Sequence, residues 1–288
     1  MILGVVGNPR YAEVPALLSR LRAAAPGLGI EVRLESDLAA FWPEVVPTPF
    51  EGPPPDVVLA IGGDGTLLRS ARFIGRREVP LVGVHVGRLG FLSSVTPGEF
   101  DQALQLLALG EYTTEQRQML EAEVESADAV RSVGMALNDA VVHKAGVARV
   151  VRLGILADGE TVGAFSSDGI IIATPTGSTA YSLSAGGPIV VPGVDALVIT
   201  PICPHTLGVR PIVVHGKAEI QVTLLPPIGE EDVLLSLDGQ IGTPIMEGDR
   251  IRVRRANHLL KLVRFHEDGF FATLRRKLQW GDPSGRDR

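Results

Sequence analysis

The first hundred or so residues alternate between two hydrophobic patterns. Short continuous apolar runs are typical of strands buried on both faces of a parallel sheet, and apolar residues three or four positions apart are typical of helices. Strands that alternate with helices predict an α/β domain with a doubly wound parallel sheet. The predicted strands are 2–6, 30–34, 56–61 and 80–86, the predicted helices are 12–25, 66–75 and 97–109, and the proline-rich segment 43–55 is predicted to be a surface connection.

Short strand patterns dominate from about residue 120 onward. In the segment 218–225, for example, every second residue is apolar, as in a sheet with one solvated face. We therefore predict a β-rich C-terminal domain over 116–265, after an α/β N-terminal domain over 1–115. The segment 269–280 returns to helical spacing, and we expect the tail 266–288 to pack back on the first domain. The predicted strands of the second domain are 120–124, 141–143, 150–156, 170–173, 196–200, 218–225, 233–237 and 250–254.

Composition and charge exclude several classes of protein. The 288 residues are 45% hydrophobic, and the formal net charge is -6, which argues against a nucleic-acid binder. The single cysteine, Cys203, excludes an internal disulfide and a cysteine-cluster zinc site. The N-terminus does not have the pattern of a signal peptide, and no apolar run has the ~18 residues of a membrane span. We expect a cytoplasmic protein that does not associate with membranes.

A glycine-rich loop stands between the predicted strand 56–61 and the helix that follows. It reads Gly62-Gly63-Asp64-Gly65-Thr66. Glycines allow the backbone to approach a ligand, and the first N–H groups of a helix suit a phosphate. The loop differs from a Walker loop, which ends in Gly-Lys-Ser or Gly-Lys-Thr, and from the dinucleotide fingerprint of dehydrogenases, because Leu68 replaces its third glycine.

Asp64 is unusual in a loop of this kind because a carboxylate repels phosphate. It needs a task there, such as taking a proton from an attacking hydroxyl or holding Mg²⁺. The alternative interpretation is that Asp64 only caps the helix, as aspartate often does. The loop by itself leaves both interpretations open.

A second candidate segment, 174–188, is rich in hydroxyl groups and glycine and contains one aromatic residue, Tyr181. Hydroxyls can bind sugar and purine edges while an aromatic ring packs against a base. An ordinary serine-rich and glycine-rich turn is the alternative. Three acidic turns, at Asn138-Asp139, at Asp168 and at Asp238-Gly239, could complete a site or could be plain turns. We interpret His143 as a sheet residue, His205 as a loop residue and no histidine pair as a metal site.

Taken together, in this order and at these intervals, the motifs resemble those of the NAD kinase family. The glycine-rich loop is weak evidence by itself, since lipid kinases carry a similar loop and phosphofructokinases a related one. The hydroxyl-rich segment is far more specific. The resemblance covers most of the chain and includes Gly62–Thr66, Gly87–Leu92, Arg117 with Leu120, Ala136–Asp139, Asp168-Gly169, Thr174–Pro188, Pro201–Arg210, Asp238–Gln240 and Phe270–Gly281.

The resemblance implies phosphorylation of the 2′-hydroxyl on the adenosine ribose of NAD, with ATP or polyphosphate as donor, a divalent cation such as Mg²⁺, and a homo-oligomeric assembly, either a dimer or a tetramer. It assigns NAD binding to the β-rich domain. Asp64 would be the catalytic acid–base residue, and Gly62, Gly63, Gly65 and Thr66 the phosphate loop. The implied NAD-binding residues are Gly65, Asn138, Asp139, Thr179, Ala180, Tyr181 and Ser184, with Asp168 near the nicotinamide end.

Two positions depart from the pattern of the family. Asp139 stands where the family usually has Glu, and His85 stands where it usually has Asn. Two other functions remain as alternatives. A lipid kinase would share the Gly62–Thr66 loop but would leave the hydroxyl-rich segment unexplained. A non-catalytic NAD-binding sensor would not require Asp64.

Overall fold

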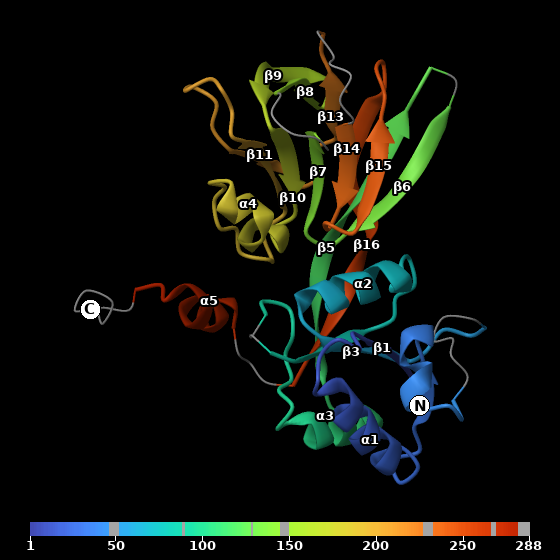
Figure 1. Cartoon of the computed structure of the whole chain (residues 1–288). Coiled ribbons are helices and arrows are strands. Elements are labelled where there is room, and N and C mark those ends of the chain that lie inside the picture. The colour runs from blue at the N-terminus through green and yellow to red at the C-terminus, as the bar shows by residue number, and fades with distance from the viewer. Residues whose placement is uncertain are drawn as a thin grey trace. The chain divides into compact units, whose positions relative to one another are not determined.

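The computed structural model describes residues 1–45, 52–87, 90–127, 129–144, 150–226, 233–265 and 269–281. The chain forms two compact units. The first contains Met1–Gln116 and the segment from Leu260 onward, and the second contains Arg117–Leu259. The chain passes between them within two long strands, β5 (Thr113–Glu125) and β16 (Arg250–Arg264) (Figure 1).

The sheet of the N-terminal unit is parallel, as the sequence predicts. Its strands are β1 (Ile2–Gly7), β2 (Glu31–Leu34), β3 (Val57–Gly62) and β4 (Leu81–His85), in the order β2-β1-β3-β4. The end of β16 adds to β4, where Leu262 pairs in parallel with Leu81. β3 is buried along its whole length, which explains its continuous apolar sequence.

Helices cover both faces of this sheet. α1 (Val14–Ala24) and α3 (Phe100–Leu109) pack together on one face, with Leu3, Val5 and Leu59 of the strands among their core neighbours. α2 (Asp64–Ile74) lies on the other face, against β3 and β4 (Figure 1). The structure also has a short 3-10 helix, η1 (Ser36–Phe41), within a segment that the pattern left unassigned. Residues 46–51 of the predicted proline-rich connection lie outside the described residues.

The tail forms α5 (Phe270–Leu278), which belongs to the N-terminal unit. Of its side chains only Leu274 is buried, and the basic residues Arg275, Arg276 and Lys277 are exposed, as expected of a solvated helix face. Lys277 lies with its ammonium 5.0 Å from the centroid of the Phe91 ring. Residues 266–268 and 282–288 of the predicted tail lie outside the described part of the chain.

The C-terminal unit is built from antiparallel strands in two layers. One sheet has the order β12-β11-β10-β7-β14-β15. In the other layer β9, β8, β13 and β16 are neighbours, and β5 pairs with both β16 and β6. The further bounds are β6 Val130–Ala136, β7 Asp139–Lys144, β8 Val151–Ala157, β9 Glu160–Ser167, β10 Gly169–Ala173, β11 Ala196–Ile202, β12 Ile212–His215, β13 Ile220–Leu224, β14 Val233–Leu237 and β15 Ile241–Ile245.

The core of this unit lies between the two layers. Ala140 and Val142 of β7 join it, and so do Leu153 of β8 and Val222 of β13. Since neighbouring side chains of a strand point to opposite faces, the odd-numbered residues of β7 are directed away from this core. Asp139 and His143 of β7 therefore share the outer face of the six-stranded sheet.

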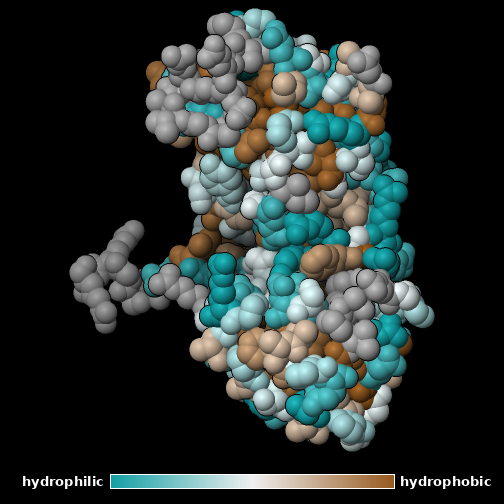
Figure 2. Space-filling view, turned by 45° about the vertical axis from the view of Figure 1, so that its right-hand side comes forward, coloured by the Kyte–Doolittle hydropathy of each residue, from teal (hydrophilic) through white to brown (hydrophobic). Residues whose placement is uncertain are grey.

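The surface mixes polar and apolar residues. On the face drawn in Figure 2, hydrophilic and hydrophobic side chains are intermingled. No helix in the described part of the chain is both long enough and apolar enough to cross a membrane.

Candidate active site

The glycine-rich loop joins β3 to α2, and the helix begins two residues earlier than the pattern predicts. Gly63 occupies the N-cap position, so Asp64, Gly65 and Thr66 form the first turn of α2. Asp64 is half-buried, Gly65 is exposed and Thr66 is buried. The exposed backbone of Gly65 lies at the positive end of the helix dipole, where anions bind.

Asp64 does not cap its helix. Its carboxylate instead accepts hydrogen bonds from the backbone N–H groups of Phe91, at 2.9 Å, and Leu92, at 3.4 Å. The neighbouring Gly90 lies so close that a Cβ there would overlap the carboxylate. Gly90, Phe91 and Leu92 therefore fix the orientation of Asp64, and Arg88 and Leu89 of the same motif lie outside the described residues.

His85 lies close to this loop in the sheet. It is the last residue of β4 and pairs with Gly62 of β3. Its Nδ1 atom is buried and has no hydrogen-bond partner among the described residues. The departure from the usual Asn thus stands directly beside the glycine-rich loop.

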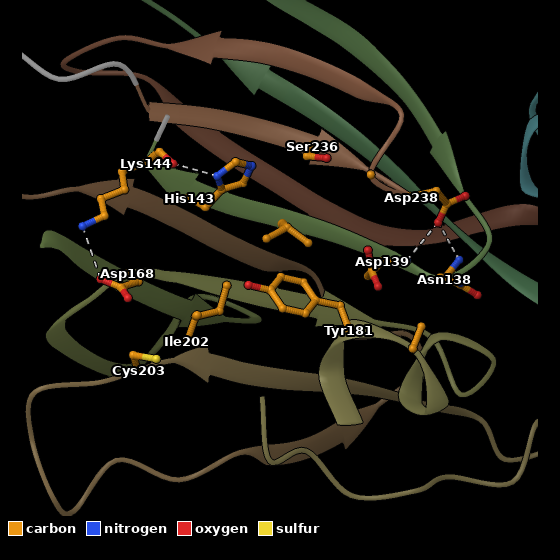
Figure 3. A pocket seen from close by; sticks show the side chains of 13 residues that line it. Asn138, Asp139, His143, Lys144, Asp168, Tyr181, Ile202, Cys203, Ser236 and Asp238 are labelled. Carbon is orange, nitrogen blue, oxygen red and sulfur yellow. Dashed lines mark hydrogen bonds and ion pairs between the residues drawn. The ribbon is translucent and has the colours of Figure 1, made fainter. Parts of the chain in front are cut away.

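A cavity of about 730 Å³ opens on the outer face of the six-stranded sheet in the C-terminal unit. Its size suits a ligand of nucleotide dimensions. Figure 3 shows side chains from several separate turns and strands directed toward it. The lining residues are Asn138, Asp139, Val141, His143, Lys144, Asp168, Ala180, Tyr181, Ile202, Cys203, Ser236, Asp238 and Gly239.

Five of the residues expected to bind NAD meet around this cavity: Asn138, Asp139, Asp168, Ala180 and Tyr181. The other three expected residues do not line it. Thr179 bonds its hydroxyl to the Thr176 carbonyl oxygen, and Ser184 is exposed at the end of α4 (Tyr181–Ser184). Gly65 belongs to the N-terminal unit.

Most hydroxyls of the segment 174–188 bond within the protein. Thr174 donates to the Leu137 carbonyl oxygen at 2.6 Å, Ser178 donates to the Pro175 carbonyl oxygen at 2.6 Å, and Ser182 lies 2.8 Å from the Thr200 hydroxyl. Thr174, Ser178 and Ser182 are all buried. The segment is therefore a rigid support from which Ala180 and Tyr181 reach the cavity, because its hydroxyls are already used.

Tyr181 presents its ring to the cavity and is 47% exposed. Partial burial raises its pKa, and Cys203, Asp168 and Asp139 add to that effect. The phenol accordingly keeps its proton at neutral pH. The ring supplies an apolar face, and the hydroxyl can donate a hydrogen bond.

Asp139 is buried in the cavity wall, with 5% of its surface exposed. Burial, followed by the charge of Asp238, raises its pKa from 3.8 to about 7. No donor from the described residues reaches its carboxylate. Asp139 is thus a carboxylate that changes charge near neutral pH, beside an empty space that a ligand can fill.

Asp238 has a different role from Asp139. It follows β14, and its carboxylate accepts three backbone N–H bonds, from Leu137 at 2.8 Å, Asn138 at 2.7 Å and Asp139 at 3.1 Å. The sequence pattern interprets this aspartate only as a member of an acidic turn. Figure 3 shows its carboxylate directed toward the turn that carries Asn138 and Asp139.

Comparison with known proteins identifies the family. Residues 43–112 match the ATP-NAD kinase N-terminal domain, and residues 137–265 match the ATP-NAD kinase C-terminal domain. An NAD kinase from Gemmatimonas aurantiaca is 44% identical over 100% of this chain and 99% of its own length. The chain belongs to the NAD kinase family.

Solved structures of the family share the fold. Yeast NADH kinase, determined in complex with NADH, is 27% identical and superimposes with a TM-score of 0.86 over 98% of this chain and 88% of its own. An NAD kinase from Archaeoglobus fulgidus in complex with ATP is 26% identical, with a TM-score of 0.75 over 97% of this chain and 99% of its own. Membership of the NAD kinase family makes the chain a kinase, and both the lipid-kinase and the sensor alternatives are set aside.

Sequence reasoning missed several residues of the cavity. It interpreted His143 as an ordinary sheet residue, and the ring Nδ1 does lie 2.8 Å from the Lys144 carbonyl oxygen, but the side chain also lines the cavity. Lys144 pairs with Asp168, its ammonium 3.4 Å from the carboxylate. The alternation along β7 was the available signal, because residues 139, 141 and 143 share one face. Nothing in the local sequence marks Ile202, Cys203 and Ser236.

A divalent cation suits the residues that are present. No group of three His, Cys, Asp or Glu side chains that could hold a metal occurs in the described part of the chain. Mg²⁺ in kinases is commonly bound by one or two carboxylates together with the phosphates of the substrate and water. An ion held mainly by the phosphates of the donor and by water therefore needs no cluster of acidic side chains.

Proposed function

We propose that this NAD kinase transfers the terminal phosphoryl group of ATP to the 2′-hydroxyl of the adenosine ribose of NAD, with Asp64 as the catalytic base. The observation that carries the proposal is the orientation of Asp64. Its carboxylate stands at the start of α2 and is fixed by Phe91 and Leu92, although the helix does not use it as a cap. A carboxylate held in a phosphate loop without a capping role is suited to proton transfer.

The glycine-rich loop binds the donor in this proposal. The exposed amide of Gly65 and the dipole of α2 favour a phosphate group, with Gly62, Gly63 and Thr66 shaping the turn. The complex of the Archaeoglobus fulgidus relative with ATP supports ATP as donor. A divalent cation held with the phosphates would neutralise the charge that develops during transfer.

The cavity of the C-terminal unit binds the acceptor. Asn138 offers an amide and Asp139 a carboxylate for ribose hydroxyls, while Tyr181 packs against a ring of the dinucleotide. Asp168 lies toward the nicotinamide end, and Ala180 adds an apolar contact. Thr179 and Ser184 frame the segment that carries Tyr181. The complex of the yeast relative with NADH supports a dinucleotide acceptor.

Asp64 acts on one proton in the reaction. It accepts the proton of the 2′-hydroxyl as that oxygen forms its bond to the γ-phosphorus of ATP. The bond between the γ-phosphorus and the bridging oxygen breaks, and ADP leaves with the electron pair. Positioned proton transfer of this kind contributes typically ~10²–10⁴ in rate.

We also propose that the enzyme is a homo-oligomer, either a dimer or a tetramer. The resemblance of the motifs to those of the family supports this assembly. Light scattering coupled to size-exclusion chromatography measures it directly. A mass of a single 30.6 kDa chain at working enzyme concentration contradicts the proposal.

The activity itself is tested with purified protein, ATP, Mg²⁺ and NAD. NADP is detected by an NADP-specific dehydrogenase, and polyphosphate and NADH replace ATP and NAD in parallel reactions. We expect NADP to form with ATP in a reaction that requires the divalent cation. No NADP or NADPH in any of these reactions would refute the proposal.

A further inference from the structure

We propose that Asp238 is a positioning residue of the NAD pocket, which holds the turn at Leu137–Asp139 and so sets how Asn138 and Asp139 meet the ligand. This inference rests on the proposed function of the pocket. Asp238 acts through the turn rather than on the reacting atoms. Four observations support it: the bonds of its carboxylate, the opposite clamp on the turn, its charge beside Asp139, and the contrast with a second Asp-Gly turn.

The bonds of Asp238 are unusually complete. Oδ2 accepts the N–H of Leu137 at 2.8 Å, and Oδ1 accepts the N–H groups of Asn138 at 2.7 Å and Asp139 at 3.1 Å. The backbone N–H of Asp238 donates in return to the carbonyl oxygen of Asp139 at 3.0 Å. Bonds from neutral N–H groups to an ionised carboxylate are among the stronger ones in proteins. Three consecutive amides are therefore fixed by one side chain.

The same turn is clamped from its other side. The backbone N–H of Thr174 donates to the Asn138 carbonyl oxygen at 2.8 Å, and the Thr174 hydroxyl donates to the Leu137 carbonyl oxygen at 2.6 Å. Gly177 lies against the backbone of Asn138, where a Cβ would overlap it. The N–H groups of the turn depend on Asp238, and its carbonyl groups depend on Thr174. Without the carboxylate, the N–H groups lose their protein acceptor.

Asp238 also affects the charge of Asp139. Its negative charge is the second cause, after burial, of the raised pKa of Asp139, which is about 7. The other titratable groups around the cavity are Asp168, Lys144, His143, Tyr181 and Cys203. Removal of the Asp238 charge must therefore lower the pKa of Asp139. The pKa of Asp139 thus reports the charge of Asp238 separately from the hydrogen bonds that Asp238 accepts.

The chain supplies a matched control in Asp158. Asp158-Gly159 and Asp238-Gly239 are both Asp-Gly turns in the C-terminal unit, and the aspartates have φ of 50° and 51°. Asp158 also bonds to a neighbouring segment, because its carboxylate accepts the N–H of Glu219 at 2.9 Å. Asp158 is exposed and does not line the cavity. The carboxylate of Asp238 accepts bonds from three amides of the pocket turn, whereas that of Asp158 accepts the amide of Glu219, which does not line the cavity.

The experiment compares Asp238→Asn and Asp158→Asn with the wild type. Asparagine tolerates the left-handed backbone of both turns, so the turns themselves are retained. In Asp238→Asn the amide group must face at least one N–H donor of the turn. Steady-state rates of NADP formation and calorimetric titration of NAD are measured at several values from about pH 5.5 to about pH 8.5, together with thermal midpoints.

We expect Asp238→Asn to raise KM and Kd for NAD by about tenfold or more, with a smaller change in kcat, since a buried donor is left unsatisfied. NAD binding by the wild type should weaken as the pH falls through about 7, because Asp139 then takes up its proton. We call this fall of NAD affinity toward low pH the acidic limb. In Asp238→Asn the acidic limb should move to lower pH. Asp158→Asn should keep the wild-type affinity and the wild-type limb.

Three results would overturn the inference. One is an Asp238→Asn enzyme with the affinity and pH limb of Asp158→Asn. Another is weaker binding at every pH with an unmoved limb, which assigns Asp238 a structural role only. The third is failure of both Asp238→Asn and Asp238→Ser to fold while Asp158→Asn folds, since Asp238 then serves folding. A wild type that makes no NADP refutes the proposed function instead, and the two failures are thus distinguishable.

Discussion

The glycine-rich loop and the NAD pocket use aspartate in opposite ways. Asp64 belongs to a contiguous motif, Gly62–Thr66, and two backbone N–H groups fix its carboxylate. Asp139 belongs to a pocket assembled from several turns, where burial, and after it the charge of Asp238, raises its pKa to about 7. The difference accords with the proposal that the loop serves one chemical step, whereas the pocket holds an acid that a ligand must satisfy.

The two aspartates also differ in their expected effect on the stability of the fold. A carboxylate that accepts N–H bonds stabilises its surroundings, whereas one that is desolvated without a donor destabilises them. Binding sites commonly carry such a local cost, because their polar groups are arranged for a ligand rather than for the folded chain. The following predictions test whether Asp64 serves the chemical step and Asp139 serves ligand binding at a cost in stability.

The largest expected effect is on kcat when Asp64 is neutralised. Asp64→Asn should lower kcat by on the order of 10²–10⁴, because the amide cannot take the hydroxyl proton. Initial rates at saturating ATP and NAD measure it. Asp101→Asn is the matched control, since Asp101 lies in the first turn of α3 and forms an exposed pair with Arg20. Retention of most of the wild-type kcat by Asp64→Asn would return Asp64 to a structural role.

The next effect is on stability. Because the pKa of Asp139 is raised in the folded state, the folded protein binds a proton that the unfolded chain has lost, and stability falls as the pH rises from about 4 to about 7. Asp139→Asn removes this penalty. We expect it to raise the free energy of unfolding by roughly 2–4 kcal/mol at about pH 8 and by little at about pH 4, since each pKa unit is worth about 1.36 kcal/mol. Thermal unfolding at both pH values decides the matter: an equal change at both would contradict the raised pKa.

Substitutions of Asp139 should also change the affinity for NAD. Asp139→Ala should weaken NAD binding by ~1–3 kcal/mol, through the loss of a polar contact. Asp139→Glu should keep an active enzyme with a modestly changed KM, because the longer side chain reaches across a gap that a water would bridge for aspartate, at an immobilisation cost of about 0–2 kcal/mol. Calorimetric titration of NAD into both variants measures these effects. If the alanine variant binds NAD as the wild type does, Asp139 only shapes the turn.

The smallest effect is expected at Tyr181. Tyr181→Ala should raise KM for NAD by the equivalent of ~0.5–1.5 kcal/mol, because the ring loses its packing against the ligand. The thermal midpoint without ligand should change little, since 47% of the residue is exposed. Phe271→Ala, at an exposed aromatic residue of α5, is the control and should leave KM unchanged. Unfolding of Tyr181→Ala with an unaltered KM in the folded fraction would contradict a place in the pocket.

The sequence predicted most of the N-terminal unit because each strand there is a continuous apolar run followed by a clear helix, as in β3 and α2. It missed β6, β9, β12 and β15. β9 illustrates the reason, because it is an edge strand with mostly exposed or half-buried residues and therefore has little hydrophobic signal.

The residues of the candidate site also differ in how far the sequence predicts them. Asp64 could be found because its loop is contiguous, and Asn138, Asp139 and Tyr181 because their motifs resemble those of a family. The role of Asp238 could not be found from the sequence, since Asp158-Gly159 carries the same turn signal and bonds elsewhere. The internal use of the Thr174 and Ser182 hydroxyls could not be found either, because their partners, Leu137 and Thr200, lie on other segments. Those bonds depend on strand register, which local pattern does not encode.

Titration of NAD into Asp64→Asn tests the central claim most directly, since it asks whether the loop serves chemistry and the pocket serves binding. Calorimetry with the wild type and the variant, in the absence of ATP, gives the two dissociation constants under identical conditions. The account predicts that Asp64→Asn binds NAD within about twofold of the wild type while it forms NADP at least about a hundredfold more slowly. A Kd raised tenfold or more would contradict the account, because Asp64 would then belong to the acceptor site itself.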